Sequence, residues 1–291
     1  MKPKKILSHI SDCVFIGLFI WLLAFPNYAA EPTRKALEFC AKTLIPSLFI
    51  YTVLAKTVIS SPPVQKLSER IGLVPLTLII GTLCGCPIGA KISLSLYENG
   101  QIDKRYAEYI CSFANNASLS FVLGYVGNEL FGDLLIGVRL LVYQLIASVV
   151  TAAIMKRVIF GNERLPRVCA SLTKRVSLSE SIADGAMTMI NIASSAVFFI
   201  VVSNALSHLI CLPDEFFAAL KSLLEFSSGC AAAAKTDSFA LTVTAFALGH
   251  CGASVAMQVK SVLSGKLLIT PYLVGKAISC TVMTLLAVIF G

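Results

Sequence analysis

Apolar stretches long enough to cross a lipid bilayer recur along almost the whole chain, and this recurrence constrains the fold most. A helix needs about 20 predominantly apolar residues to span a hydrocarbon core of roughly 30 Å. The full-length candidate spans are 12–30, 39–60, 107–127, 134–155, 186–209, 239–260 and 269–290. Charged residues make up 14% of the 291 positions, whereas soluble domains average about 25%. The sequence therefore predicts an all-α, multi-pass membrane protein.

The net charge of +8 does not indicate a nucleic-acid partner. The basic residues lie in short loops between apolar segments, a distribution typical of the positive-inside rule. The most basic of these loops carries Lys156, Arg157, Arg164, Arg167, Lys174 and Arg175. We therefore expect membrane lipid, and no nucleic acid, among the partners of this chain.

Two further apolar stretches are interrupted in the middle. The stretch 73–97 is broken by Cys84–Gly89, and the stretch 217–235 is broken by Ser227–Gly229. Glycine lowers helix propensity and proline also removes a backbone donor. Non-helical backbone at membrane depth is tolerated only where protein or a water-filled cavity satisfies it. Both stretches are therefore predicted to be re-entrant hairpins of two half-helices.

The charges of the loops favour a topology with a cytoplasmic N-terminus, in a cell or spore membrane. If each hairpin returns to the side from which it entered, all the basic loops fall on the cytoplasmic side: 61–72, 98–106, 156–181 and 260–267. The acidic loops 128–133 and 210–216 then fall outside. The first apolar run resembles a retained helix or a cleaved signal peptide. We favour the retained helix because everything that follows is also membrane-embedded.

The order of the predicted elements repeats in the two halves of the chain. Residues 39–155 and 186–291 each give a span, a hairpin and two spans, so an odd number of crossings inverts the second unit. Gly85–Lys91 also resembles Gly229–Lys235 in register. Inverted repeats with broken helices are the usual architecture of secondary transporters, although chance symmetry is the alternative. The predicted units are 1–38 (N-terminal helix and loop), 39–155 (first repeat), 156–185 (basic cytoplasmic linker) and 186–291 (second, inverted repeat).

The predicted helix breaks supply the first candidate binding residues. Exposed half-helix N-termini carry partial positive charge and free amide donors, which suit anionic groups. The candidates at the breaks are Gly85, Cys86, Pro87, Gly89, Ser227, Ser228 and Gly229. Lys91 and Lys235 follow the two breaks, and a lysine at membrane depth is usually functional. The alternatives are close helix packing at the small residues and snorkelling of the lysines to the interface.

Polar residues inside other apolar runs extend the candidate set. Asn115 and Asn116 occupy different faces of one predicted helix, so one amide could bond across helices while the other lines a path. Ser254 and Gln258 share a helix face at i, i+4 spacing. Glu225 precedes the second break and is a candidate proton or cation site. Interhelical hydrogen bonding and a position at the hairpin mouth are the structural alternatives.

Catalysis has no positive support in the sequence, so we expect no enzyme, no metal and no cofactor. His250 stands beside Cys251, but the chain has no GxSxG, HExxH or Walker pattern. The chain has ten cysteines, most of them within apolar runs, where a thiol behaves as a small hydrophobe. Their spacing matches no zinc site.

Two ordered blocks resemble the YlbJ-type sporulation integral membrane proteins, of the nucleoside-recognition (Gate) domain group. The first block comprises Gly81–Lys91, Tyr97–Gly100 and Phe113–Asn116, and the second comprises Leu224–Cys230, Gly252–Gln258 and Pro271–Lys276. The resemblance spans about 39–290. It implies a fold akin to concentrative nucleoside transporters, with about seven transmembrane helices and two re-entrant hairpins. It also implies movement of dipicolinic acid across a spore membrane during sporulation.

The leading hypothesis is thus a transporter of a small anionic solute, dipicolinate above all. A proton or sodium ion is a candidate coupling cation, and the fold class allows a homo-oligomer. Two alternatives stay open at this point. One is a nucleoside or ion carrier of the same fold, and the other is a non-transporting membrane scaffold in spore-envelope assembly.

Overall fold

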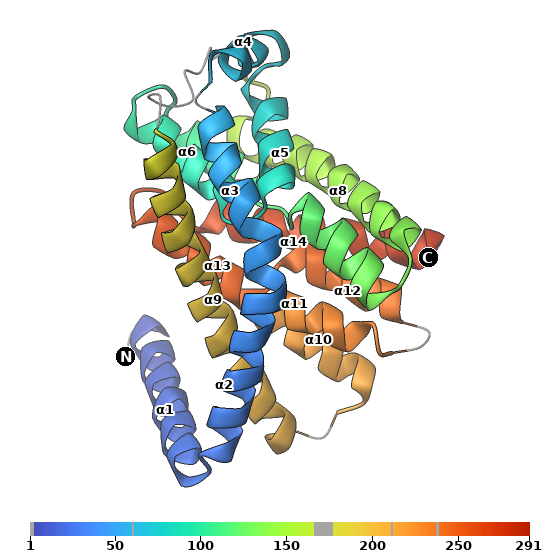
Figure 1. Cartoon of the computed structure of the whole chain (residues 1–291). Helices are drawn as coiled ribbons and strands as arrows, with labels where there is room; N and C mark the ends of the chain where they lie inside the picture. Colours follow the sequence, from blue (N-terminus) through green and yellow to red (C-terminus); the bar gives the residue numbers. More distant parts are fainter. Residues whose placement is uncertain (1–2, 60, 166–176, 211, 237–238) are drawn as a thin grey trace.

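The computed structural model describes residues 3–59, 61–165, 177–210, 212–236 and 239–291, and all regular elements in these ranges are helices (Figure 1). The first half contains α1 (Pro3–Ala24), α2 (Asn27–Phe39), the π-helix η1 (Cys40–Leu44), α3 (Ile45–Ile59), α4 (Pro62–Ile71), α5 (Leu73–Cys84), α6 (Ile88–Glu98), α7 (Lys104–Phe113), the π-helix η2 (Phe121–Leu130) and α8 (Leu134–Phe160). The second half contains α9 (Leu178–Leu209), α10 (Asp214–Leu224), α11 (Phe226–Ala233), α12 (Ala240–His250), α13 (Gly252–Leu263) and α14 (Thr270–Phe290).

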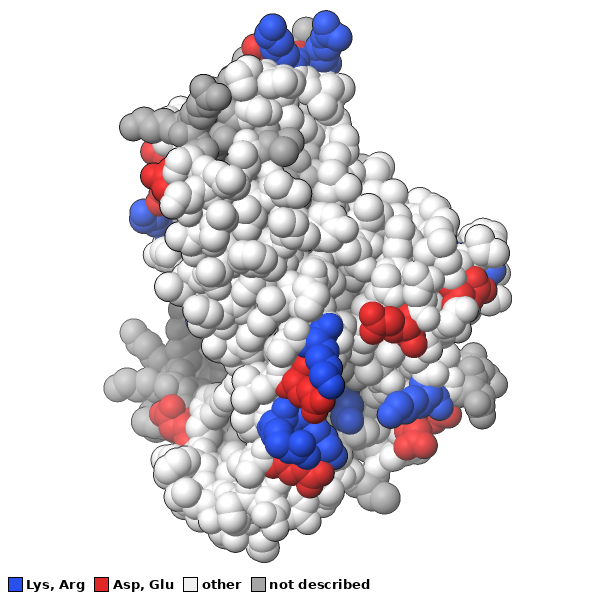
Figure 2. Space-filling view, in the orientation of Figure 1, with Lys and Arg blue, Asp and Glu red and all other residues white. Residues whose placement is uncertain are grey.

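Within the described residues, five helical segments are long and apolar enough to cross a membrane. They are Asn27–Leu54, Leu134–Phe160, Leu178–Leu209, Ala240–Leu263 and Thr270–Phe290. Large apolar side chains also remain on the outer surface, as Leu145, Ile146 and Val149 do on α8. Figure 2 shows charged side chains at the upper end and in the lower part of one face, with a broad uncharged area between them. The chain is a multi-pass membrane protein.

Three of the seven predicted spans are interrupted in the structure. The span expected over 107–127 ends as α7 at Phe113 and resumes as η2 at Phe121. The span expected over 239–260 is divided into α12 and α13 by Cys251, whose φ of 64° is left-handed. The run expected over 12–30 also turns, because α1 ends at Ala24 before α2 begins. The apolar patterns of these segments are membrane-like, but composition alone does not reveal where a helix stops.

Both stretches predicted to be interrupted do form pairs of short helices. Helices α5 and α6 are joined by Gly85–Pro87, and Gly85 adopts a φ of 82° that favours glycine. Helices α10 and α11 meet at Glu225, so the break lies two residues before the predicted Ser227–Gly229, which form the first turn of α11. The two hairpins lie in opposite halves of the molecule in Figure 1, with α5 in the upper half and α10 in the lower half.

Helix α13 packs against both hairpins, on α6 of the first and on α10 of the second, and the long helices surround this centre. Helix α14 packs against α7, α8 and α12, while α9 packs against α2, α3 and α13. One apolar cluster, which includes Tyr109 and Tyr272, surrounds the first hairpin. A second cluster, which includes Phe121 and Met283, lies between η2, α8 and α14. Helix α1 stands apart from this bundle beside α2 (Figure 1). The order of hairpin, broken helix and long helix occurs in both halves, and the inverted-repeat relationship stays a prediction.

Candidate functional site

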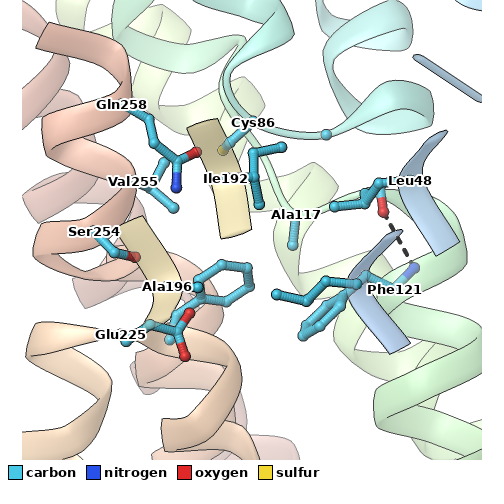
Figure 3. A pocket seen from close by; sticks show the side chains of 14 residues that line it. Leu48, Cys86, Ala117, Phe121, Ile192, Ala196, Glu225, Ser254, Val255 and Gln258 are labelled. Atoms are coloured by element: carbon cyan, nitrogen blue, oxygen red, sulfur yellow. Dashed lines mark hydrogen bonds between the residues drawn. The ribbon is translucent and has the colours of Figure 1, made fainter. Parts of the chain in front are cut away.

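The four interruptions of the helices meet at one small cavity. Three interruptions contribute residues directly to its wall: Gly85 and Cys86, Ala117 and Ser118, and Glu225 and Phe226. The fourth, at Cys251, contributes through the helix that follows it, since Ser254, Val255 and Gln258 lie on α13. Side chains of η1, α3 and α9 close the remaining sides, among them Leu48, Ile192 and Ala196. In Figure 3, Ser254 and Gln258 of one helix face this cavity, with Cys86 and Glu225 on either side. We call it the central cavity.

The side chain of Asn115 hydrogen bonds to the backbone at the start of α6, the second helix of the first hairpin. Its Oδ1 accepts a 2.9 Å hydrogen bond from the backbone N–H of Ala90, and its Nδ2 donates to the carbonyl of Cys111 at 2.8 Å. The loop of the hairpin is held on the same segment, because the N–H of Cys86 donates to the carbonyl of Asn116 at 2.8 Å. The N-cap residue of α6, Pro87, has no side chain that can cap the helix. Asn115 therefore supplies the cap from a distant part of the chain.

Gln144 of α8 performs the same task for the break between α7 and η2. Its Nε2 donates to the carbonyl of Ala117 at 3.0 Å, and its Oε1 accepts from the N–H of Ala117 at 3.2 Å. Ser148, one turn further, donates to the Oδ1 of Asn116 at 3.1 Å. Gln144 and Ser148 are both buried. The interrupted backbone thus remains hydrogen bonded at membrane depth, as a non-helical segment there requires.

We expect Gln144→Leu to destabilise the protein by about 2–4 kcal/mol, because it leaves one buried N–H and one buried carbonyl of Ala117 unpaired. Thr151→Val is the matched control, since Thr151 is also buried on α8 and its hydroxyl has no hydrogen-bond partner within the described residues. Unfolding in detergent, followed by circular dichroism, measures both variants. Equal stability of Gln144→Leu and Thr151→Val would show that the two hydrogen bonds between Gln144 and Ala117 contribute nothing to the free energy of unfolding.

Glu225 caps the second hairpin with its own carboxylate. Oε2 accepts from the N–H of Ser228 and from the hydroxyl of Ser227, both at 2.7 Å, and Oε1 accepts from the N–H of Ser227 at 3.1 Å. The side chain is 1% exposed. A carboxylate at a helix N-terminus is stabilised by the free amides and by the helix dipole. The first amides of α11 are thus occupied by a group of the protein itself.

A third cap and a buried cation lie at the break between α12 and α13. The Nδ1 of His250 accepts a 3.1 Å hydrogen bond from the N–H of Gly252, and the thiol of Cys251 lies 3.2 Å from the carbonyl of Leu248. Lys276 of α14 is 4% exposed and lies close to Cys251. It forms no salt bridge with a carboxylate of the described residues. A lone buried ammonium beside the central cavity is unusual and marks a candidate functional group.

The two lysines predicted as a matched pair lie apart. Lys91 turns to α9, where its Nζ lies 3.1 Å from Asp184 and 2.6 Å from the hydroxyl of Thr188. Lys235 is exposed and lines a different, wider cavity near α2 and α10. They therefore do not provide two cations for one ligand. Their spacing after the breaks is similar, but the partner of each lysine comes from a distant part of the chain.

The other predicted residues divide into cavity-lining and supporting groups. Gly85, Cys86, Glu225, Ser254 and Gln258 line the central cavity. Asn115, Asn116, Ser227 and Ser228 hold the broken backbone through the bonds described above, whereas Pro87, Gly89 and Gly229 are buried where the hairpins pack closely. The predicted free half-helix amides are capped: by Asn115 on α6 and by Glu225 on α11.

Sequence reasoning missed three groups that the structure places at this site: Gln144, the cap formed by His250, and Lys276. A lone lysine within the apolar run 269–290 was a usable signal, because it satisfies the same criterion that selected Lys91. Gln144 shares its apolar run with Arg139, Ser148 and Thr151, and its role becomes visible only when its backbone partner is known.

The chain is 22% identical to the sporulation integral membrane protein YlbJ of Bacillus subtilis (strain 168), and the alignment covers 91% of this chain and 78% of that relative. This similarity confirms the YlbJ-type resemblance that the two sequence blocks predict. No family model matches the chain, and no solved structure matches it. The nucleoside-recognition (Gate) grouping and the likeness to concentrative nucleoside transporters stay predictions.

Proposed function

We propose that this chain is a sporulation membrane protein that moves a small anionic solute, dipicolinate above all, across a membrane and without catalysis. The observation that carries the proposal is the convergence of four helix interruptions on the central cavity of a multi-pass membrane protein. Discontinuous helices that meet within a bundle are the usual site of substrate and ion binding in secondary transporters. The relative is named for sporulation, and this supports the cellular setting.

One buried cation near the site favours an anion, although Lys276 itself does not line the central cavity, whose wall carries the carboxylate Glu225. Lys276 is buried beside Cys251, and no carboxylate of the described residues pairs with it. An ammonium group removed from water is stabilised by an opposite charge, so a carboxylate of the solute would compensate it. Glu225 cannot serve this purpose while its carboxylate caps α11. We propose instead that Glu225 receives the coupling cation, proton or sodium, when the hairpin opens.

The size of the central cavity indicates that this conformation is closed. Its volume is about 30 Å³, which suits about two ordered waters, whereas pockets for small organic ligands measure about 300–1,000 Å³. Transport therefore requires at least one hairpin to move away from the opposing broken helix. Each hairpin is capped by one side chain, Asn115 on α6 and Glu225 on α11. Such a movement therefore breaks only a small number of hydrogen bonds.

The proposal is tested by uptake of radiolabelled pyridine-2,6-dicarboxylate into proteoliposomes of the purified chain, under inward proton or sodium gradients. We expect saturable uptake above that of empty vesicles, with competition by the unlabelled dicarboxylate and none by uridine. Competition by uridine would favour the nucleoside carrier. No uptake above empty vesicles under either gradient would refute the transport proposal and favour a membrane scaffold.

A further inference from the structure

A second cavity, wider than the first, lies between α2, α10 and α11. Its volume is about 430 Å³, compared with about 30 Å³ for the central cavity. Its wall includes three lysines from three separate elements: Lys35 of α2, Lys221 of α10 and Lys235, which follows α11. Figure 2 shows basic side chains in the lower part of the molecule, over α2 and α10. We call this cavity the vestibule.

The charges in the vestibule are predominantly positive. Lys35 pairs with Glu31 at 2.7 Å, and Asp214 also lines the cavity. Lys221 and Lys235 form no salt bridge with a carboxylate within the described ranges, and the ammonium of Lys221 lies 4.8 Å from the ring centroid of Phe217. Among the described residues, the wall thus carries two ammonium groups without a salt bridge and one carboxylate, Asp214, and this excess of positive charge attracts an anion.

Aromatic side chains complete the wall of the vestibule. Phe39, Tyr125 and Phe217 line it together with the lysines. Flat rings of this kind pack against a planar ligand, while the lysines bind its carboxylates. The combination therefore fits a small aromatic dianion better than an inorganic anion or a nucleoside, which lacks the negative charges.

The vestibule adjoins the cap of the second hairpin. Ser228 lines the vestibule, and its backbone N–H donates to the carboxylate of Glu225 at 2.7 Å. Glu225 in turn lines the central cavity. The first turn of α11 is thus the partition between the two cavities, so a ligand in the vestibule lies next to the hairpin that must move.

We propose that the vestibule is a docking site in which a soluble aromatic dianion binds Lys221 and Lys235 before it reaches the central cavity. This proposal rests on the proposed transport of an anionic solute and names the chemistry of its first binding step. An anionic lipid headgroup offers similar charges. We commit to the soluble dianion because the cavity is walled by five helices, α2, η2, α9, α10 and α11, and carries aromatic side chains at its surface.

Lysine acetylation followed by mass spectrometry tests the docking step on the full chain in phosphatidylcholine nanodiscs. We expect pyridine-2,6-dicarboxylate to slow acetylation of Lys221 and Lys235 at least fivefold and to leave Lys66 of α4 unaffected. The uncharged pyridine-2,6-dicarboxamide should protect neither lysine. Protection that requires phosphatidylglycerol in the nanodisc, or equal protection by the diamide, would overturn the proposal.

A pair of variants gives an independent measurement. The double variant Lys221→Gln/Lys235→Gln should bind the labelled dicarboxylate about tenfold more weakly, since the loss of each solvent-accessible ion pair weakens binding about threefold. Lys66→Gln/Lys260→Gln removes the same charge from exposed positions elsewhere and should bind as the wild type does. If proteoliposomes take up the dicarboxylate but it does not protect Lys221 and Lys235 from acetylation, the docking proposal is refuted and the transport proposal stands. If the dicarboxylate protects both lysines but is not taken up, the docking proposal is supported and the transport proposal is refuted.

Discussion

Glu225→Gln should reduce ion-driven accumulation of the dicarboxylate about 100-fold, which corresponds to about 2.7 kcal/mol. The carboxylate is 1% exposed and accepts hydrogen bonds from both Ser227 and Ser228. A glutamine offers a single acceptor oxygen and turns an NH₂ group toward one of these donors, and it carries no charge for a coupling cation. Hydrogen bonds to charged groups contribute about 1.5–3 kcal/mol, so an effect of this size is reasonable.

The same vesicles separate coupling from folding. Counterflow, the exchange of labelled for unlabelled dicarboxylate without a gradient, should persist in Glu225→Gln if the residue binds the coupling cation. Glu98→Gln is the control, because Glu98 is exposed and pairs with Lys266 at the surface, and it should accumulate the solute normally. Wild-type accumulation by Glu225→Gln would remove this residue from the coupling step.

Gly89→Ala should destabilise the folded protein by about 3 kcal/mol or more, the upper end of the usual cost of overpacking. A Cβ on Gly89 would lie 2.3 Å from the carbonyl oxygen of Ala114, and one on Gly81 would lie 1.9 Å from the same atom. Both helices of the first hairpin therefore approach the start of the α7–η2 break at the same carbonyl. Backbone atoms at this point cannot rotate away, so the hairpin must shift.

Gly124→Ala provides the comparison for this prediction. Its added Cβ meets nothing within 4 Å, and alanine has the higher helix propensity, by about 1 kcal/mol. Thermal unfolding monitored by size-exclusion chromatography in detergent ranks the two variants. We expect loss of monodisperse Gly89→Ala well below the wild-type midpoint and an unchanged or higher midpoint for Gly124→Ala. Equal midpoints would contradict the close docking of hairpin and broken helix.

The parts of the fold that local chemistry determines were predictable from the sequence. The break at Gly85–Pro87 follows from glycine and proline within an apolar run, and the structure places it there. The break after Phe113 was not predicted, because its bonds depend on Gln144, which lies 27 residues from Ala117. The break at Cys251 combines a left-handed residue that is not glycine with Gly252, whose φ of 74° is also positive. Its local signal is limited to glycine, which also occurs within uninterrupted helices of this chain, as Gly275 does in α14.

The candidate site, like the fold, contains residues that local spacing predicts and residues whose position depends on distant partners. The i, i+4 spacing of Ser254 and Gln258 placed both on one face, and both line the central cavity. The direction of Lys91 could not be predicted, since its partner Asp184 lies 93 residues away on α9. Lys276 lies within an apolar run, as Lys91 does, so the same rule for lysines at membrane depth indicates it as a candidate. Short-range periodicity thus identifies shared faces, whereas ion pairs between distant helices require the fold.

The thiol of Cys86 allows the most direct test that solute crosses where the four interruptions meet. Cys86 lines the central cavity and is partly exposed, whereas most of the other cysteines in the described residues are buried. The measurement is uptake of labelled pyridine-2,6-dicarboxylate by proteoliposomes before and after treatment with methyl methanethiosulfonate. We expect the wild type to lose uptake, unlabelled dicarboxylate to protect it, and Cys86→Ser to resist the reagent. Equal inactivation of Cys86→Ser and the wild type would contradict a pathway through the central cavity.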